Sequence, residues 1–300
     1  MISTAPDKLS KALLADEKRK QKLSVIKITG AEISNESDVV IKEAPLEISI
    51  RYGPEGDRIK ETLSVTMRTP GDDFSMVTGF LFAEHIIHRA SDIVSIRFTG
   101  NYEEELLQEN SLLVELAPEV KVHLSGRKNF LTNSACGFCG RGAFDVGANE
   151  GLYLPFAGDE KISAETLYQL PALLQSSQGL FAETGGSHAV ALLTFEGKLL
   201  KIFEDVGRHN AMDKLIGSML KQQSIPLTNR IALFSGRLSY ELVQKSLAAG
   251  IPVVCSIGAP TSLAIELASD YNMTVVGFLK PDRMNIYSDA ERIVLKKKNS

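Results

Sequence analysis

The sequence predicts an α/β protein in which a smaller, strand-rich α+β region precedes a layered domain. Residues 23–67 fall into short apolar runs separated by turn residues, which is the pattern of consecutive strands. Residues 205–279 instead alternate between helical patterns and short apolar runs. That alternation indicates a parallel sheet with helices packed on it. The apolar runs of the second half contain almost no polar residue, as expected for strands buried on both faces.

The first half is predicted to be rich in strands. Residues 1–22 are charged and weakly helical, so we expect a loose helix or tail there. The strand candidates share alternating β-branched and other apolar residues, and they cover residues 25–28, 39–41, 46–50, 63–67, 93–98 and 112–116. A helix is predicted from about Asp72 to Ile86, with Asp72, Asp73 and Ser75 as capping candidates. The glycine-rich run 147–158 is the best candidate for a domain boundary and divides the chain into residues 1–22, 23–150 and 151–300.

The second half is predicted to be a regular succession of helices and strands. The helices, with apolar residues at helical spacing, cover residues 163–174, 205–221, 239–249 and 261–271. The strands cover residues 189–195, 198–203, 230–234, 252–256 and 273–279. Cys255 lies within one of these strands and is expected to pack as a small apolar side chain.

The composition excludes several classes of protein. The chain has 44% hydrophobic and 23% charged residues, which is typical of a soluble globular protein. Its net charge of −4, without a block of basic residues inside the chain, argues against nucleic-acid binding. We also find no apolar run of roughly 18 residues and no secretory leader, so neither a membrane span nor export is expected. Three cysteines do not form a disulfide framework, which favours a cytoplasmic protein with reduced thiols.

Two of the three cysteines, Cys136 and Cys139, lie two residues apart in a segment of small residues. Such a segment is typical of an exposed, mobile loop rather than of a helix or strand. The positive charges of Arg127, Lys128 and Arg141 lie close in sequence and would favour the thiolate over the thiol. We therefore expect Cys136 and Cys139 to carry out sulfur chemistry at the tip of a loop.

A Cys-x-x-Cys pair has three common uses. Zinc normally requires four ligands, and the chain has no second cysteine pair and neither the His-x-Glu nor the Pro-Cys of zinc deaminases. Dithiol exchange of the thioredoxin type places the pair at the start of a helix, whereas Gly140 and Gly142 make a poor helix start. Sulfur transfer through a persulfide requires an accessible thiolate on a movable segment. The loop fits sulfur transfer best, although the motif alone does not decide among the three.

Several turns of the second half are candidates for a ligand site. Ser235, Gly236 and Arg237 follow one predicted strand, and a similar turn begins at Ser256. Because the carboxyl ends of parallel strands gather at one edge of a sheet, and helices begin there, these turns favour a phosphorylated ligand or nucleotide. A second group of candidates lies just before the strand at 189–195. There, Gly185 and Gly186, followed by Ser187, could let a flat ligand approach the backbone.

Arg208 and His209 occupy an unusual place for cations, in the first turn of a predicted helix. The helix dipole disfavours positive charge at that end, so a bound anion or a nearby carboxylate would have to compensate. Helical spacing also places Asp213 on the same face as His209, where it could orient the imidazole. An ordinary surface helix with mixed charges is the alternative interpretation, and we regard the functional one as the stronger.

These segments together resemble the FdhD family of formate dehydrogenase accessory proteins. The resemblance lies in five runs, which are Ser134–Gly140, Thr184–Ala189, Glu204–Lys214, Ser235–Arg237 and Gly277–Lys280. Arg68–Asp73 with Gly79–Leu81 resembles that family's early motif. The likeness extends in order over roughly residues 24–290, which makes it more specific than any single motif.

The resemblance implies a sulfurtransferase that carries sulfur from a cysteine desulfurase to the molybdenum cofactor, bis-molybdopterin guanine dinucleotide, before its insertion into formate dehydrogenase. It implies a three-layer C-terminal domain whose fold is similar to that of cytidine deaminases but holds no permanent metal. It also implies that the protein is a homodimer. Cys136 would hold the persulfide with the help of Cys139, and the stretch that would line the transient cofactor site is Val275, Val276, Gly277, Phe278, Leu279 and Lys280. At the position of Lys280, arginine is expected in many relatives. Lysine keeps the positive charge of arginine but lacks its guanidinium, which can donate two parallel hydrogen bonds. A cofactor-binding chaperone without cysteine chemistry and a zinc-dependent, deaminase-like enzyme are the alternatives.

Overall fold

A four-stranded sheet with one apolar face forms most of the N-terminal region. The computed structural model describes residues 17–100, 109–123, 156, 158, 160–289 and 291–295. The strands lie in the order β4-β3-β6-β5, and they are β3 (Ala44–Tyr52), β4 (Ile59–Arg68), β5 (Ile93–Phe98) and β6 (Ser111–Leu116). Alternate residues of the two central strands, such as Leu46 and Ile48, are buried because successive side chains of a strand point to opposite faces. Helix α2 (Asp73–Ala83) covers that face, and a single 3₁₀ turn, Ala90–Asp92, precedes β5.

The C-terminal region is built on a six-stranded sheet in the order β13-β12-β11-β10-β8-β9. Its strands are β8 (His188–Thr194), β9 (Leu199–Asp205), β10 (Arg230–Phe234), β11 (Val253–Ser256), β12 (Thr274–Gly277) and β13 (Asn285–Ser288). The parallel sheet predicted for residues 205–279 is confirmed, because β10, β11 and β12 pair in parallel. Strands β8, β9 and β13, which the prediction did not include, pair antiparallel. Strands β8 and β9 pair antiparallel because a tight turn at Gly197, whose φ is +81°, joins them. Such a hairpin leaves no room for the crossover helix that parallel neighbours need.

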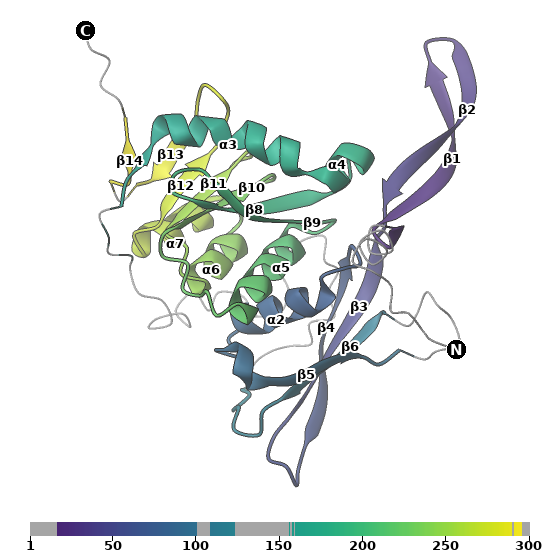
Figure 1. Ribbon diagram of the computed structural model, residues 1–300, viewed down its shortest axis with the longest axis vertical. Coiled ribbons are helices and arrows are strands. Elements are labelled where there is room, and N and C mark those ends of the chain that lie inside the picture. The colour runs from purple at the N-terminus through teal and green to yellow at the C-terminus, as the bar shows by residue number, and fades with distance from the viewer. Residues whose placement is uncertain are drawn as a thin grey trace, which may run out of the picture.

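Helices cover both faces of this sheet (Figure 1). Three of them pack on one face, and they are α5 (Arg208–Lys221), α6 (Tyr240–Ala248) and α7 (Ser262–Asp270). Helix α3 (Ala164–Ser177) packs on the other face and is followed by the short helix α4 (Gly179–Thr184). Two short strands, β7 (Ile162–Ser163) and β14 (Ile293–Val294), pair beside them. The C-terminal domain therefore has the three layers that the family resemblance implied, while its likeness to cytidine deaminases stays a prediction.

The two regions pack together where α2 crosses α5. A Cβ placed on Gly217 would lie 1.9 Å from the backbone oxygen of Ser75, and one placed on Gly79 would lie 2.0 Å from that of Asp213. Only glycine permits so close an approach of two helix backbones. The predicted boundary near residue 150 falls outside the described residues, so the division into 1–22, 23–150 and 151–300 remains a prediction.

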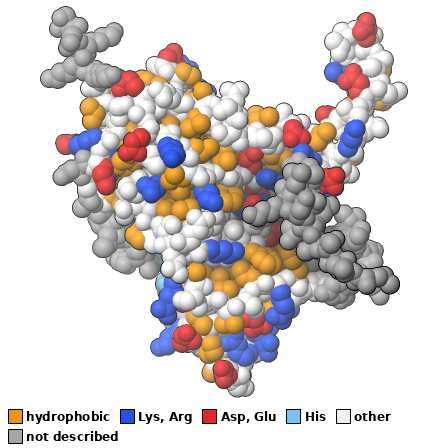
Figure 2. Space-filling model, viewed as in Figure 1, with side chains coloured by type: hydrophobic (Ala, Val, Ile, Leu, Met, Phe, Trp, Pro, Cys, Tyr) orange, Lys and Arg blue, Asp and Glu red, His pale blue; other side chains and the backbone are white. Residues whose placement is uncertain are grey.

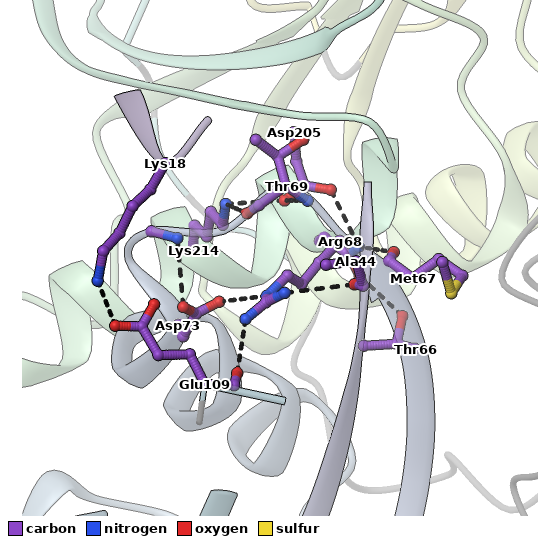
Figure 3. Close-up of polar contacts among 12 residues, drawn as sticks. Lys18, Ala44, Thr66, Met67, Arg68, Thr69, Asp73, Glu109, Asp205 and Lys214 are labelled. Carbon is purple, nitrogen blue, oxygen red and sulfur yellow. Dashed lines mark hydrogen bonds and ion pairs between the residues drawn. The ribbon is translucent and has the colours of Figure 1, made fainter. Parts of the chain in front are cut away.

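A buried polar network joins the end of β4 to the end of β9 and to the middle of α5 (Figure 3). The Asp205 carboxylate, which is fully buried, lies 2.7 Å from Nζ of Lys214 and accepts a hydrogen bond from the backbone N–H of Thr69 at 3.1 Å. Lys214 also donates to the backbone oxygen of Thr69 at 2.9 Å. Beside them, Nε of Arg68 donates to Oδ1 of Asp73 at 2.8 Å. Because buried charges are tolerated only when paired and hydrogen-bonded, this network fixes the N-terminal sheet against the C-terminal domain.

Strands β1 (Lys20–Thr29) and β2 (Glu32–Ile41) form a two-stranded arm that projects from the body (Figure 1). The strands predicted at 25–28 and 39–41 both lie in it. Strand β1 includes the last three residues of the segment 1–22, which was predicted to be a tail or loose helix. In the part of the chain that the structure describes, no helix combines the length and the apolar character needed to cross a membrane.

Candidate functional site

The segments that the sequence singled out meet at one edge of the C-terminal sheet. Strands β10, β11 and β12 end at this edge, and the antiparallel β8 begins there, since Phe234 pairs with Val190. His188, the first residue of β8, pairs with Asp205, the last residue of β9. The five segments 185–188, 204–209, 235–237, 256–258 and 277–280 therefore line a common edge. This is the edge at which open α/β sheets bind ligands.

The turn Ser235–Arg237 is held from both sides by its neighbours. Oγ of Ser235 accepts a hydrogen bond from the backbone N–H of Ala189 at 2.8 Å, so this hydroxyl serves the fold. Oγ of Ser256 donates to the backbone oxygen of Gly236 at 2.6 Å. The Arg237 side chain is exposed and makes no hydrogen bond or ion pair with the residues that the structure describes. Its guanidinium is therefore the part of this turn that can meet a ligand.

The stretch from Val275 to Lys280 divides into a buried and an accessible part. Val275, Val276 and Leu279 are completely buried in the core, so their side chains face the protein interior. Phe278 is 44% exposed and has a φ of +50°, and Lys280 is partly exposed. A Cβ placed on Gly277 would lie 2.6 Å from Cδ of Pro260, so the glycine permits close packing of the neighbouring turn. Any ligand contact from this stretch must come from Phe278, Lys280 and the backbone.

The turn Gly185–Ser187 also serves the fold in part. Gly185 ends α4 with a φ of +65°, a conformation that favours glycine. Gly186 packs against Ile41 at the base of the arm, where an added Cβ would lie 2.7 Å from its Cγ2. Oγ of Ser187 donates to Oε1 of Glu204 at 2.7 Å, and both residues are buried. The same carboxylate accepts hydrogen bonds from the first backbone N–H groups of α4.

Basic and imidazole side chains gather at the N-terminus of α5. Nε of Arg208 is buried and has no hydrogen-bond partner within the described residues. Nε2 of His209 lies 3.0 Å from Oε2 of Glu241 and 3.2 Å from Oγ of Ser239. Burial lowers the pKa of His188, and the neighbouring Arg208 and His209 lower it further, so His188 is uncharged at neutral pH. The N-terminus of α5 and the guanidinium nitrogen of Arg208, which has no partner among the described residues, together suit a bound anion.

The expectation that Asp213 orients His209 is wrong. Oδ1 of Asp213 lies 2.5 Å from Nζ of Lys245 on α6, while His209 bonds to the first turn of that helix. Burial raises the pKa of Asp213 to about 6, and the neighbouring Lys245 limits the rise. Residues of two helices thus pair across their interface, which spacing along α5 alone could not reveal. Glu241, the residue that does contact His209, was missed; its position in the first turn of a predicted helix was the available signal.

Cys136 and Cys139 lie outside the described residues, so the prediction that they occupy the tip of a loop stays a prediction. Within the described ranges, no group of three or more histidine, cysteine or acidic side chains is arranged to hold a metal ion. Cys255 is completely buried in β11, as predicted, and burial raises the pKa of its thiol to about 12. It therefore remains a thiol at neutral pH and is a poor nucleophile.

Comparison with known proteins gives matches over most of the chain. The model of the FdhD/NarQ family matches residues 41–294. Several relatives carry the name sulfur carrier protein FdhD, among them those of three organisms. That of Streptomyces coelicolor is 39% identical over 280 residues, or 92% of this chain and 96% of the relative. That of Nocardia farcinica is 42% identical over 90% of this chain and 93% of its own length. That of Sulfolobus acidocaldarius is 41% identical over 92% of this chain and 99% of its own length.

A solved structure shares the fold. The crystal structure of a putative formate dehydrogenase accessory protein from Desulfotalea psychrophila superimposes with a TM-score of 0.67. The match covers 92% of this chain and 99% of that one, with 24% sequence identity. At this identity the likeness establishes the mixed α/β fold alone.

Proposed function

The chain belongs to the FdhD/NarQ family, and from that membership we propose that it is a sulfur carrier for the molybdenum cofactor. In this proposal it receives sulfur from a cysteine desulfurase, passes it to bis-molybdopterin guanine dinucleotide, and so prepares the cofactor for formate dehydrogenase. The supporting observation is identity of about 40% with proteins named sulfur carriers over at least nine-tenths of this chain. The transfer would take place in the cytoplasm, where thiols stay reduced.

The proposed chemistry uses Cys136 and Cys139 in turn. The Cys136 thiolate attacks the outer sulfur of the desulfurase persulfide, whose S–S bond breaks and releases the desulfurase thiolate. A new S–S bond then holds the sulfur on Cys136. Attack by the Cys139 thiolate on Sγ of Cys136 releases the outer sulfur as sulfide for the cofactor and leaves a disulfide. A thiol reductant must then reduce this disulfide before the next cycle.

The edge of the C-terminal sheet suits one guanine nucleotide moiety of the cofactor, which is the substrate here. Phe278 offers an exposed aromatic ring on which a base can stack. Arg208 and Arg237 offer guanidinium groups, which match the geometry of phosphate oxygens. The N-terminus of α5 adds backbone N–H groups and a favourable dipole. The residues present therefore fit a phosphorylated ligand with a flat ring.

Replacing Cys136 with alanine is expected to abolish transfer, because no other cysteine can hold sulfur in its place for Cys139 to release. The measurement is formate dehydrogenase activity after apoenzyme, cofactor, desulfurase and L-cysteine are incubated with the protein. Cys255→Ala is the matched control, and it should retain activation because the Cys255 thiol is buried and protonated. Full activation by Cys136→Ala would contradict sulfur transfer and favour the cofactor chaperone. One tightly bound zinc ion per chain in a metal analysis would instead favour the deaminase-like alternative.

Replacing Phe278 with alanine is expected to weaken guanosine diphosphate binding about tenfold, since base stacking on an aromatic side chain is worth about 1–3 kcal/mol. The dissociation constant can be measured by titration calorimetry. Phe181→Ala is the matched control, because Phe181 on α4 is also 44% exposed. If Phe278→Ala and Phe181→Ala bind guanosine diphosphate with equal affinity, the guanine base does not stack on Phe278.

A further inference from the structure

The base of the two-stranded arm is attached to helix α4 and to the turn that follows this helix. Nζ of Lys20, the first residue of β1, lies 2.7 Å from Oε2 of Glu183. Ile41, the last residue of β2, lies against Gly186, where an added Cβ would be 2.7 Å from Cγ2 of Ile41. Figure 1 shows α4 beside the base of the arm, and Figure 2 shows acidic and basic side chains gathered there. Both strands of the arm therefore contact one short segment of the C-terminal domain, residues 183–186.

Arg19, which directly precedes β1, makes a third connection. Its Nη2 donates a hydrogen bond to the backbone oxygen of Glu204 at 3.1 Å. The Glu204 carboxylate in turn accepts a hydrogen bond from Oγ of Ser187 at 2.7 Å, and others from the first backbone N–H groups of α4. The base of the arm thus holds the turn Gly185–Ser187 in two ways, directly through Ile41 and indirectly through Glu204.

The turn Gly185–Ser187 is the first in a row of turns along the ligand-binding edge of the C-terminal sheet. Gly236 in the second turn packs against His188, since an added Cβ would lie 3.2 Å from Nδ1 of that residue. Gly258 in the third turn packs against the second, because an added Cβ would lie 3.1 Å from the backbone nitrogen of Arg237. Closely packed segments transmit a displacement instead of absorbing it. A shift at the base of the arm would therefore reach the turns that are proposed to bind the nucleotide.

We infer that Ile41 and Arg19 are positioning residues for the ligand, because they hold the turn Gly185–Ser187 beside the nucleotide site. This inference rests on the proposed function, in which the edge of the C-terminal sheet binds a guanine nucleotide. The turn is exposed at its two glycines, so its backbone is open to a ligand. A purely structural attachment of the arm is the alternative. It would change the free energy of unfolding and leave the affinity of the folded protein for a nucleotide unchanged.

Replacing Gly186 with alanine is expected to weaken guanosine diphosphate binding about tenfold, which is within the range for substitutions that act through a packed network. The new methyl group would meet Cγ2 of Ile41 and displace the turn. Gly186→Ala combined with Ile41→Ala should regain an affinity within about twofold of the wild type, because the second substitution removes the atom that the methyl group meets. Ile41→Ala and Arg19→Ala alone should each weaken binding about threefold, since the turn loses a support. Titration calorimetry on the full-length chain gives each dissociation constant.

Ile26→Ala is the matched control, because it makes the same change on the outer part of the arm, where Ile26 is 70% exposed, and should bind like the wild type. Equal affinities of the wild type, Ile41→Ala and Arg19→Ala would overturn the inference, even if thermal unfolding showed the two variants to be less stable. A loss in Gly186→Ala that the double variant does not recover would also overturn it, since the methyl group would then act on the ligand itself. A wild type that does not bind guanosine diphosphate would overturn the nucleotide site as well, whereas sulfur uptake on Cys136 is measured separately.

Discussion

Replacing Gly217 with alanine is expected to lower the free energy of unfolding by about 3 kcal/mol or more, at the upper end of the cost of overpacking a close contact. The new Cβ would lie 1.9 Å from the backbone oxygen of Ser75 and 2.7 Å from the backbone nitrogen of Gly79. These are backbone atoms of α2, which cannot move aside as a flexible side chain can. Helices α2 and α5 would have to separate, and the contact between the two regions would weaken.

Gly179→Ala is the matched control for this substitution. A Cβ on Gly179 would meet no atom within 4 Å, and alanine is favoured over glycine in a helix by up to about 1 kcal/mol. We therefore expect Gly179→Ala to be neutral or slightly stabilising. Both values can be obtained from urea denaturation of the two variants beside the wild type. Similar unfolding midpoints for the two variants would show that α2 and α5 are not in backbone contact.

Replacing Lys214 with methionine is expected to cost about 3–5 kcal/mol of stability, the usual effect of removing one partner of a buried ion pair. The change would leave the Asp205 carboxylate buried without its counter-charge, and the backbone oxygen of Thr69 would lose a donor. Because this network joins β4 to α5, the loss should affect the whole chain. Denaturant unfolding followed by circular dichroism measures it.

The control for Lys214→Met is the same substitution at an exposed ion pair. Lys27 and Glu36 pair on the arm with 58% and 44% of their side-chain surface exposed. Exposed pairs contribute roughly 0–1 kcal/mol, so Lys27→Met should change stability by less than about 1 kcal/mol. A comparable loss at both positions would contradict a special role for the buried network.

Local patterns predicted most of the elements correctly. The strand at 230–234 has the predicted bounds, and the helix predicted at 239–249 is present at Tyr240–Ala248. In both elements most apolar residues of the sequence pattern are buried in the structure, so the pattern alone was enough to predict them. Helix α4 and strand β13 were not predicted, because each is short, and the place of α4 also depends on distant residues. Backbone N–H groups of α4, for example, bond to Glu204, over twenty residues further along the chain.

The run from Glu204 to Lys214 shows what the sequence could not distinguish. Its dense charges were interpreted as chemistry at a site, and Arg208 and His209 do lie at the edge where the other candidates gather. Asp205 and Lys214, however, are buried and join regions more than one hundred residues apart in the chain. A functional cluster and a buried structural network use the same residue types, and only the long-range contacts separate them.

The claim on which this account depends is that Cys136 accepts sulfur. The most direct measurement is the intact mass of the protein after incubation with a cysteine desulfurase and L-cysteine, followed by alkylation and peptide mapping. The wild type and Cys255→Ala should each gain about 32 Da, the mass of one sulfur atom held as a persulfide, on the peptide that contains Cys136. Cys136→Ala should show no such gain. An unmodified wild type, or the same adduct in Cys136→Ala, would contradict the proposed function.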